Sequence, residues 1–210
     1  MERELKYSLT EDYFPSAAEL RVVFGPGDFD IGQPSTSKQH DRYFDDARSS
    51  LSRAGLALRR RMADGQLLAT LKTRGSVKSA YHVREEIELP ITEIDQFWPA
   101  PIMDRVSVVT APASLRAQID LDTERLRYAV TRRGRVLATL SFDMVTVEPS
   151  HGDQRVVFNE VEIEAVGETD EATLEEIAAL LDQVTPLSPN SSSKLERALA
   201  LLSLGESLDD

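Results

Sequence analysis

Hydrophobic and polar residues alternate with a period of two through most of the chain, which is the pattern of β-strands. Ala63-Asp64-Gly65 and Arg133-Gly134 interrupt the alternation with short turn sequences of the kind that close hairpins. Strands joined by such turns pair in antiparallel fashion. We expect strands near residues 1–9, 38–45, 56–63, 66–74, 79–89, 117–132, 135–147 and 155–166.

Helical spacing of apolar residues marks shorter stretches between and after these strands. The first follows Pro15, with the proline expected near the first helical position. The second covers 170–184, where Asp170 is the expected N-cap, and the third covers 192–203. The whole pattern predicts an α+β fold, an eight-stranded antiparallel β-barrel with helices packed on the outside, as one domain over 1–210.

The unusual feature of the expected strands is an ionised side chain at every second position, with both signs present. The opposite faces carry apolar residues such as Leu71, Leu140 and Ile163. The charged faces hold Glu2, Glu4 and Lys6; Arg59 and Arg61; Lys72; His82, Arg84, Glu86 and Glu88; Arg125 and Arg127; Asp143; and Glu160, Glu162 and Glu164.

Each charged face taken alone is most simply explained as a solvated strand exterior. Taken together, the faces crowd like charges, such as Glu160 beside Glu162, and like charges destabilise a sheet. Such clusters are tolerated best around an ion of opposite charge. A barrel with these faces turned inward would supply carboxylates for a metal and a ring of cations for phosphate.

Six ordered blocks of the sequence resemble one family, the CYTH superfamily of triphosphate tunnel metalloenzymes. They run from residue 2 to about residue 200, so the resemblance covers nearly the whole chain. The blocks are Glu2-x-Glu4-x-Lys6; Tyr43-Phe44-Asp45 with Leu51 and the AGLALRRR run of 54–61; Thr70-Leu71-Lys72; Arg84-Glu85-Glu86-Ile87-Glu88; Glu160-Val161-Glu162-Ile163-Glu164; and Ser193-Lys194-x-x-Arg197-Ala198-Leu199.

The resemblance implies a tunnel that binds a triphosphate end-on with Mg²⁺ or Mn²⁺. The metal ligands that it implies are Glu2, Glu4, Asp143, Glu160 and Glu162. The phosphate contacts that it implies are Lys6, Arg59, Arg61, Lys72, Arg84, Arg125, Arg127 and Lys194. Lys194 would reach the substrate from a helix that lies over one tunnel mouth.

Several assignments within this set stay open. Either Arg125 or Arg127 is the main phosphate contact, and Glu164 could replace a neighbouring carboxylate. Glu86 holds either a basic residue or a water. Lys72 and Glu162 are the candidate catalytic residues; crowding by cations would lower the pKa of Lys72 and make it a credible base.

Composition limits the alternatives. The chain has no cysteine, and its histidines His40, His82 and His151 lack metal-protease spacing, so a zinc site is not expected. The formal charge of −12 argues against a nucleic-acid partner, and no apolar run is long enough to span a membrane. Without a recognisable secretory signal we expect a cytoplasmic protein, monomer or homodimer, whose partner is a small-molecule triphosphate.

Members of the family catalyse several reactions in the same type of tunnel, so three functions remain possible for this chain. The first is hydrolysis of the terminal phosphoanhydride of inorganic triphosphate or an organic triphosphate such as thiamine triphosphate. The second is a class IV adenylyl cyclase, which converts ATP to cyclic AMP and pyrophosphate. The third is a non-catalytic module that binds polyphosphate or another polyanion. A module that only binds an anion has no need for five carboxylates, and the sequence shows no base-recognition pocket of the kind that a cyclase needs. The double-arginine face and the AGLALRRR run also resemble bacterial inorganic triphosphatases, so we favour hydrolysis.

Overall fold

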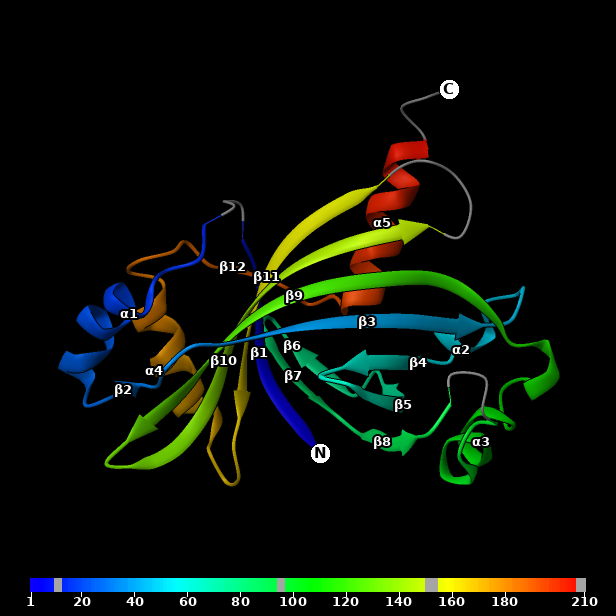
Figure 1. Ribbon diagram of the computed structural model, residues 1–210, viewed down its shortest axis with the longest axis horizontal. Coiled ribbons are helices and arrows are strands. Elements are labelled where there is room, and N and C mark those ends of the chain that lie inside the picture. Colours follow the sequence, from blue (N-terminus) through cyan, green and yellow to red (C-terminus); the bar gives the residue numbers. More distant parts are fainter. Residues whose placement is uncertain (10–12, 94–96, 150–154, 207–210) are drawn as a thin grey trace.

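The computed structural model describes residues 1–9, 13–93, 97–149 and 155–206, and within them the strands form one curled antiparallel sheet (Figure 1). The strands are β1 (Glu2–Leu9), β2 (Asp30–Ile31), β3 (Ser35–Asp45), β4 (Leu56–Ala63), β5 (Gln66–Thr73), β6 (Ser76–Lys78), β7 (Tyr81–Arg84), β8 (Glu86–Ile91), β9 (Arg116–Arg132), β10 (Arg135–Pro149), β11 (Val156–Ala165) and β12 (Ser188–Pro189). The helices are α1 (Ala17–Phe24), α2 (Ser50–Arg53), α3 (Ala100–Val106), α4 (Glu171–Leu181) and α5 (Lys194–Glu206), with 3-10 turns η1 (Gly25–Gly27) and η2 (Pro112–Ser114).

The order of the strands explains how the sheet curls. Neighbouring strands run β6-β7-β1-β11-β10-β9-β3-β4-β5-β8, with β12 beside β1 and β2 beside β9. β7 and β8 lie near opposite ends of this order, yet only Glu85 separates them along the chain. The backbone itself therefore links the two ends of the sheet. The α+β fold with an antiparallel, barrel-like sheet is confirmed.

The prediction of one continuous strand over 79–89 is wrong. The segment divides at Glu85: β7 pairs with β1, whereas β8 pairs with β5. At the division, the Glu85 carbonyl accepts the Thr73 N–H at 3.0 Å, and the Glu85 N–H donates to Thr73 Oγ1 at 3.2 Å. The alternation hides this bend, because Arg84 and Glu86 on either side of it both face the interior.

Two helices cover the outer, apolar side of the long strands. Leu20 of α1 and Ile177 of α4 pack against Leu140, Phe142 and Ile163, and all five side chains are buried. Figure 1 shows α1 and α4 side by side at one end of the molecule, with α3 at the other end. This is the arrangement expected if the apolar faces point outward beneath helices and the charged faces point inward.

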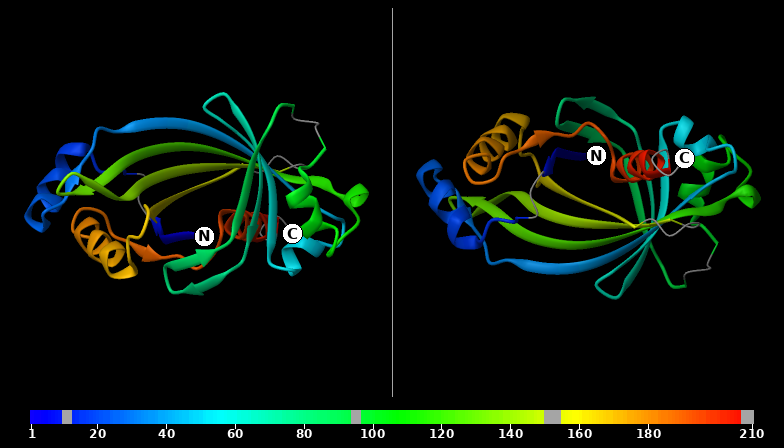
Figure 2. Two further views of the ribbon diagram at one scale, coloured as in Figure 1. Left: turned by 90° about the horizontal axis from the view of Figure 1, so that it is seen from below. Right: turned by 90° about the horizontal axis from the view of Figure 1, so that it is seen from above.

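Helix α5 differs from the expected outer position. Its residues Leu195 and Ala198 pack against Leu121, Val145 and Phe158, which lie on the same strand faces as the charged residues. Figure 2 shows α5 on the concave side of the long strands. The inner surface of the sheet is thus apolar beneath α5 and charged beyond it, so α5 bounds the charged interior at this end.

Capping side chains set where two of the helices begin. Ser16 and Glu19 form a capping box, so α1 begins after Ser16 and Pro15 precedes the cap instead of opening the helix. Asp170 caps α4 as predicted, accepting the Thr173 N–H at 2.9 Å.

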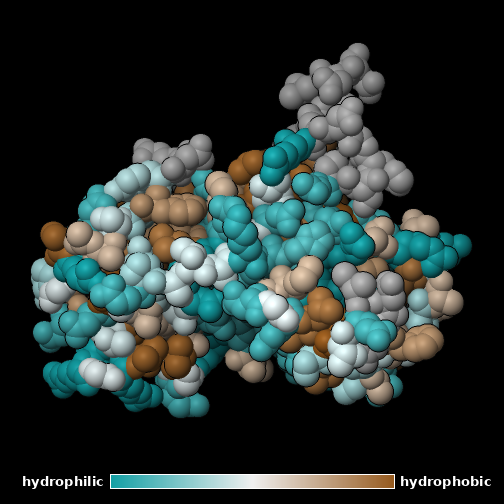
Figure 3. Space-filling view, in the orientation of Figure 1, coloured by the Kyte–Doolittle hydropathy of each residue, from teal (hydrophilic) through white to brown (hydrophobic). Residues whose placement is uncertain are grey.

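None of the helices in the described part of the chain combines the length and the apolar composition that a membrane crossing requires. The face of the molecule that Figure 3 shows is mostly hydrophilic, with small, separate hydrophobic groups.

Candidate active site

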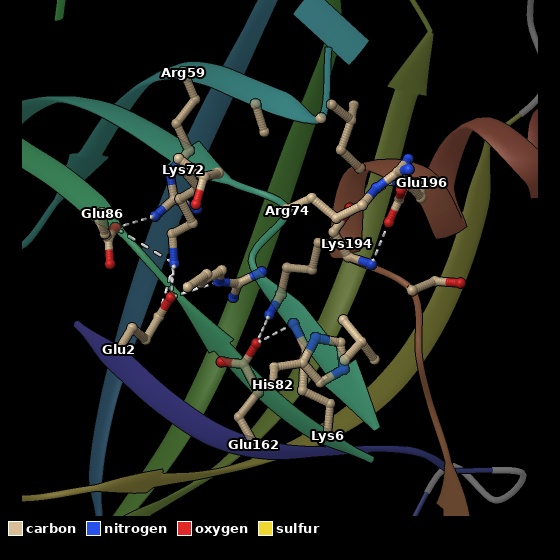
Figure 4. Close-up of a pocket in the computed structure, with 18 of the residues that line it drawn as sticks. Glu2, Lys6, Arg59, Lys72, Arg74, His82, Glu86, Glu162, Lys194 and Glu196 are labelled. Atoms are coloured by element: carbon tan, nitrogen blue, oxygen red, sulfur yellow. Dashed lines mark hydrogen bonds and ion pairs between the residues drawn. The ribbon is translucent and has the colours of Figure 1, made fainter. Parts of the chain in front are cut away.

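A cavity of about 600 Å³ lies inside the curled sheet, and charged side chains line it (Figure 4). The charged strand faces that were predicted to point inward do so. Three of the predicted site residues, Glu4, Asp143 and Glu160, are buried behind the lining. The charged residues of the lining are Lys6, Arg59, Arg61, Lys72, Arg74, Arg84, Arg125, Arg127 and Lys194, and Glu2, Glu86, Glu88, Glu162, Glu164 and Glu196.

Asp143 on β10 and Glu160 and Glu162 on β11 form what we call the acid cluster. Antiparallel pairing places Asp143 directly opposite Glu160, and Glu162 is two residues further along the same face of β11. Carboxylate oxygens from all three residues lie within 4.8 Å of one another. The register of two neighbouring strands is therefore enough to bring the three acids together.

Three cations, Lys6, Arg125 and Lys194, form ion pairs with Glu162 of the acid cluster, and a fourth, Arg197, lies 3.8 Å from Glu160. Arg125 donates to Asp143 at 2.7 and 2.5 Å and to Glu162 at 2.5 Å. Lys6 lies 2.8 Å from Glu162, and Lys194 lies 2.7 Å from Asp143 and 2.9 Å from Glu162. Burial alone would raise the pKa of Glu162, but the three cations hold it well below the ordinary carboxyl value. The carboxylate is therefore ionised at neutral pH.

Glu160 has ion-pair neighbours but no hydrogen bond. Its side chain is 0% exposed, and neither carboxylate oxygen accepts a hydrogen bond from the described residues. A buried carboxylate is costly unless cations compensate its charge, and Lys194, Lys6 and Arg197 all form ion pairs with Glu160. The cluster offers oxygen donors only, which suits a hard divalent cation. Asp143, Glu160 and Glu162 thus fit a metal that binds through oxygen.

Glu2 and Glu4 pair mainly with Lys72 and Arg84, and Glu4 also lies 3.9 Å from Lys6, which pairs with the acid cluster. Lys72 Nζ lies 2.8 Å from Glu2 Oε1, and Arg84 donates to Glu2 at 2.6 Å and also pairs with Glu4. Burial would raise the pKa of Glu2, but Lys72 and Arg84 lower it to about 2. The structure divides the five predicted metal ligands into the acid cluster and this pair, so metal ligation by Glu2 and Glu4 stays a prediction.

Asp41, on the inner face of β3, is a site residue that the sequence analysis missed. It is 0% exposed and accepts two hydrogen bonds of 2.7 Å from Arg61 and one of 3.2 Å from Arg59. Burial alone would raise its pKa, but the two arginines lower it to about 2. The sequence contained one signal for including Asp41 in the site. It is a carboxylate on the strand before the arginine-rich block, at the position that pairs with Arg61.

Arg127 differs from the other cations that line the cavity. Its guanidinium forms no ion pair with any carboxylate in the described part of the chain, and its Nε has no hydrogen-bond partner there. Arg125, in contrast, forms ion pairs with Asp143 and Glu162. Of the two arginines left open by the sequence, Arg127 is the one with unused donors for an anion; its contact with substrate stays a prediction.

The pKa of Lys72 lies below the ordinary lysine value, in the direction that the sequence analysis expected. Burial is the larger cause, with Arg59 and Arg84 contributing, while Glu2 and Glu86 act in the opposite direction. Glu86 lies 3.4 Å from Lys72 and 3.8 Å from Arg59, so it holds basic residues, one of the two roles considered for it.

The histidines do not form a metal site within the described residues. His40 lies 2.9 Å from Asp122 on the other face of β3 from Asp41. His82 lines the cavity, and its Nε2 donates to the Asn190 carbonyl at 2.9 Å. His151 lies outside the described residues.

Glu164 continues the carboxylate row of β11 at an exposed position in the cavity. Although solvent reaches the side chain, the surrounding protein and the charges of Glu2, Glu4 and Glu162 raise its pKa to about 7. At acidic pH it is protonated and adds no repulsion. Above pH 7 it is ionised against three other carboxylates.

We expect Glu164→Gln to stabilise the protein in a pH-dependent way. Since the folded state raises this pKa above its ordinary value of 4.5, ionisation of Glu164 destabilises the fold progressively as pH rises from 4.5 to 7. The melting temperature of the variant should exceed that of the wild type at pH 8 and approach it at pH 4.5. An equal difference at both pH values would show that Glu164 has an ordinary pKa.

An antiparallel sheet curled around a lumen in which acids and arginines meet defines a tunnel-type class of protein. The chain belongs to the CYTH domain family, whose model matches residues 1–199. CYTH triphosphatases depend on metal, and the acid cluster is consistent with that property. A search of curated proteins gives no significant match.

Solved structures share the fold at low sequence identity. A putative adenylyl cyclase from Hippeastrum, described as having a dominant triphosphatase activity, is 22% identical, with a TM-score of 0.64 over 95% of this chain and 96% of that one. A putative adenylate cyclase from Bacillus halodurans is 17% identical, with a TM-score of 0.61 over 94% and 98%. The PH1819 protein of Pyrococcus horikoshii is 17% identical, with a TM-score of 0.54 over 95% and 99%.

Proposed function

We propose that this protein is a metal-dependent triphosphatase that hydrolyses the terminal phosphoanhydride of inorganic triphosphate or of an organic triphosphate such as thiamine triphosphate. One observation carries the proposal: the acid cluster and a set of arginines share a single cavity of about 600 Å³. Membership of the CYTH family, which includes triphosphatases, supports the same conclusion.

The charge of the cavity favours a metal together with a polyphosphate over either alone. Nine lysine and arginine residues line it against six glutamates, and the buried acids Glu4, Asp41, Asp143 and Glu160 nearly balance this excess. A triphosphate alone would add several uncompensated negative charges, and a divalent metal alone would add two positive ones. Bound together, the two ligands largely neutralise each other.

The side chains of the cavity have distinct tasks in this reaction. Arg59, Arg61 and Arg127 present planar forks that bind phosphate oxygens in pairs. Asp143, Glu160 and Glu162 would hold Mg²⁺ or Mn²⁺, which when bound supplies Lewis acidity and lowers the pKa of water. Because phosphoryl transfer needs mainly positioning and charge stabilisation, these tasks cover the catalytic requirements.

The proton of the attacking water needs an acceptor within the cavity. Lys72, whose pKa is lowered chiefly by burial, is the residue that we assign to this step. The cations around the leaving diphosphate stabilise the negative charge that it acquires. Glu162, the second candidate catalytic residue, acts in this scheme as a metal ligand.

The adenylyl cyclase reaction is the weaker candidate. A cyclase must hold an adenine ring, and among the described residues that line the cavity Tyr43 is the only Phe, Tyr or Trp. The Tyr43 hydroxyl already accepts from Arg59 at 3.5 Å, and its ring packs with the apolar residues beneath α5. A base-stacking role for this ring would compete with both contacts.

A substrate panel tests the proposed function. Purified protein with Mg²⁺ or Mn²⁺ should release phosphate from inorganic triphosphate, thiamine triphosphate or both, and should make little cyclic AMP from ATP. Formation of cyclic AMP and pyrophosphate as main products would favour the cyclase, and tight binding of triphosphate without turnover would favour the polyanion-binding module.

Arg127→Ala should raise the KM for the preferred triphosphate about tenfold or more, because an unpaired bidentate donor is lost.

A further inference from the structure

The side chain of Lys194 lies within the acid cluster. Its Nζ is 2.7 Å from Asp143 Oδ2 and 2.9 Å from Glu162 Oε1, and it also forms an ion pair with Glu160. The side chain is only 7% exposed. Burial alone would lower the pKa of Lys194, but the three carboxylates raise it above the ordinary lysine value, so the side chain is an ammonium ion.

An ammonium ion in contact with all three acids occupies the position that a shared metal ion would take. The carboxylate oxygens that define the cluster lie within 4.8 Å of one another, so they enclose room for one small cation. A divalent metal needs the same oxygens at about 2.0–2.6 Å. Lys194 and a metal therefore cannot both hold all three acids.

The ammonium ion neutralises charge in the cluster but does not donate a hydrogen bond to every carboxylate. Of the three acids, Glu162 accepts a hydrogen bond from Lys194, whereas Glu160 accepts none. Lys6, Arg125, Lys194 and Arg197 supply four positive charges for three carboxylates, so a metal added to this arrangement would leave excess positive charge. Departure of Lys194 removes one of these charges and frees the oxygens for the metal.

We propose that the acid cluster is a cation-exchange site, filled by the Lys194 ammonium group when no metal is bound and by a divalent metal after the ammonium group has left. The exchange concerns metal binding alone and does not require the proposed triphosphatase activity. If that activity is present, the exchange also turns Lys194 from a ligand of the acids into a free cation for the phosphates.

The attachment of α5 allows this exchange. Lys194 is the first residue of α5, and Ser193 and Glu196 form hydrogen bonds in both directions at the start of the helix, at 3.2 and 2.8 Å. Arg74, which also lines the cavity, pairs with Glu196 at 3.3 Å, where both side chains are exposed. Because these contacts and the apolar side of α5 hold the helix, rotation of the lysine side chain is enough to vacate the cluster.

The test measures metal binding without substrate. Mn²⁺ affinity is determined by electron paramagnetic resonance for the wild type, Lys194→Met and the control Lys38→Met; Lys38 is 84% exposed and pairs with a single carboxylate. Lys194→Met should bind Mn²⁺ about tenfold more tightly or better, because its competing charge is gone, and Lys38→Met should match the wild type. Unchanged or weaker Mn²⁺ binding by Lys194→Met would overturn the proposal.

A second measurement uses the intact side chain and so does not depend on the folding of the methionine variant. In protein labelled with ¹⁵N-lysine, the Nζ signal of Lys194, assigned with Lys194→Arg, should shift or exchange rapidly with water as Mg²⁺ saturates the protein. The Lys38 signal should stay unchanged. A Lys194 signal that is insensitive to saturating Mg²⁺ would refute the exchange. Failure of the proposed triphosphatase activity would leave both readouts intact.

Discussion

Replacement of Glu160 by glutamine should reduce metal-dependent triphosphate turnover by at least about 10²-fold, the largest effect that we expect from a single isosteric change. Glu160 is fully buried in the acid cluster, and its carboxylate contributes one of the three negative charges that would hold the metal. The amide keeps the volume of the side chain but removes a negative charge from the site. Phosphate release at saturating and limiting Mg²⁺ measures the loss.

A matched control separates this effect from a general electrostatic one. Glu124→Gln makes the same chemical change on an exposed side chain that pairs with Lys38 at 2.8 Å. Its turnover should equal that of the wild type, and its free energy of unfolding should change by about 1 kcal/mol or less. Wild-type turnover in a folded Glu160→Gln protein would remove the acid cluster from the mechanism.

Asp41→Ala should destabilise the protein by about 3–5 kcal/mol, because it leaves Arg59 and Arg61 without their shared buried carboxylate. Urea unfolding measures this cost. Added triphosphate should raise the melting temperature of the variant more than that of the wild type, since an anion would replace the missing charge. The pKa of Asp41 is lowered to about 2, so its contribution is complete above the ordinary value of 3.8 and is lost as pH falls toward 2.

Asp120 offers a close control for Asp41. It accepts from Arg42 at 2.8 and 2.9 Å with the same two-bond geometry, but on the other face of the sheet, where its side chain is 24% exposed. Asp120→Ala should cost about 1 kcal/mol or less. If both variants lose the same stability, burial between the arginines is not what makes Asp41 important.

Alternation along each strand was sufficient to predict which side chains share a face. It placed Arg59 with Arg61 on one face and Glu160 with Glu162 on another, because side chains two residues apart in a strand lie on the same side of the sheet. The family resemblance supplied the same residues in order. Their roles toward metal and substrate remain predictions that the experiments above test.

What the sequence could not provide was the pairing of residues across strands. The bend at Glu85 preserves the alternation, so the change of partner strand from β1 to β5 left no local trace. For the same reason Asp41 was missed, since its importance arises from the register that sets it opposite Arg61. The separation of Glu2 from the acid cluster likewise depends on which cations the curled sheet brings beside each carboxylate.

The most direct measurement is a crystal structure of the protein with Mn²⁺ and inorganic triphosphate, using anomalous scattering to locate the metal. We expect a manganese peak within contact distance of Asp143, Glu160 and Glu162, and phosphate density beside Arg127 in the same cavity. Manganese or triphosphate bound on the outer surface, with the cavity free of both, would contradict this expectation.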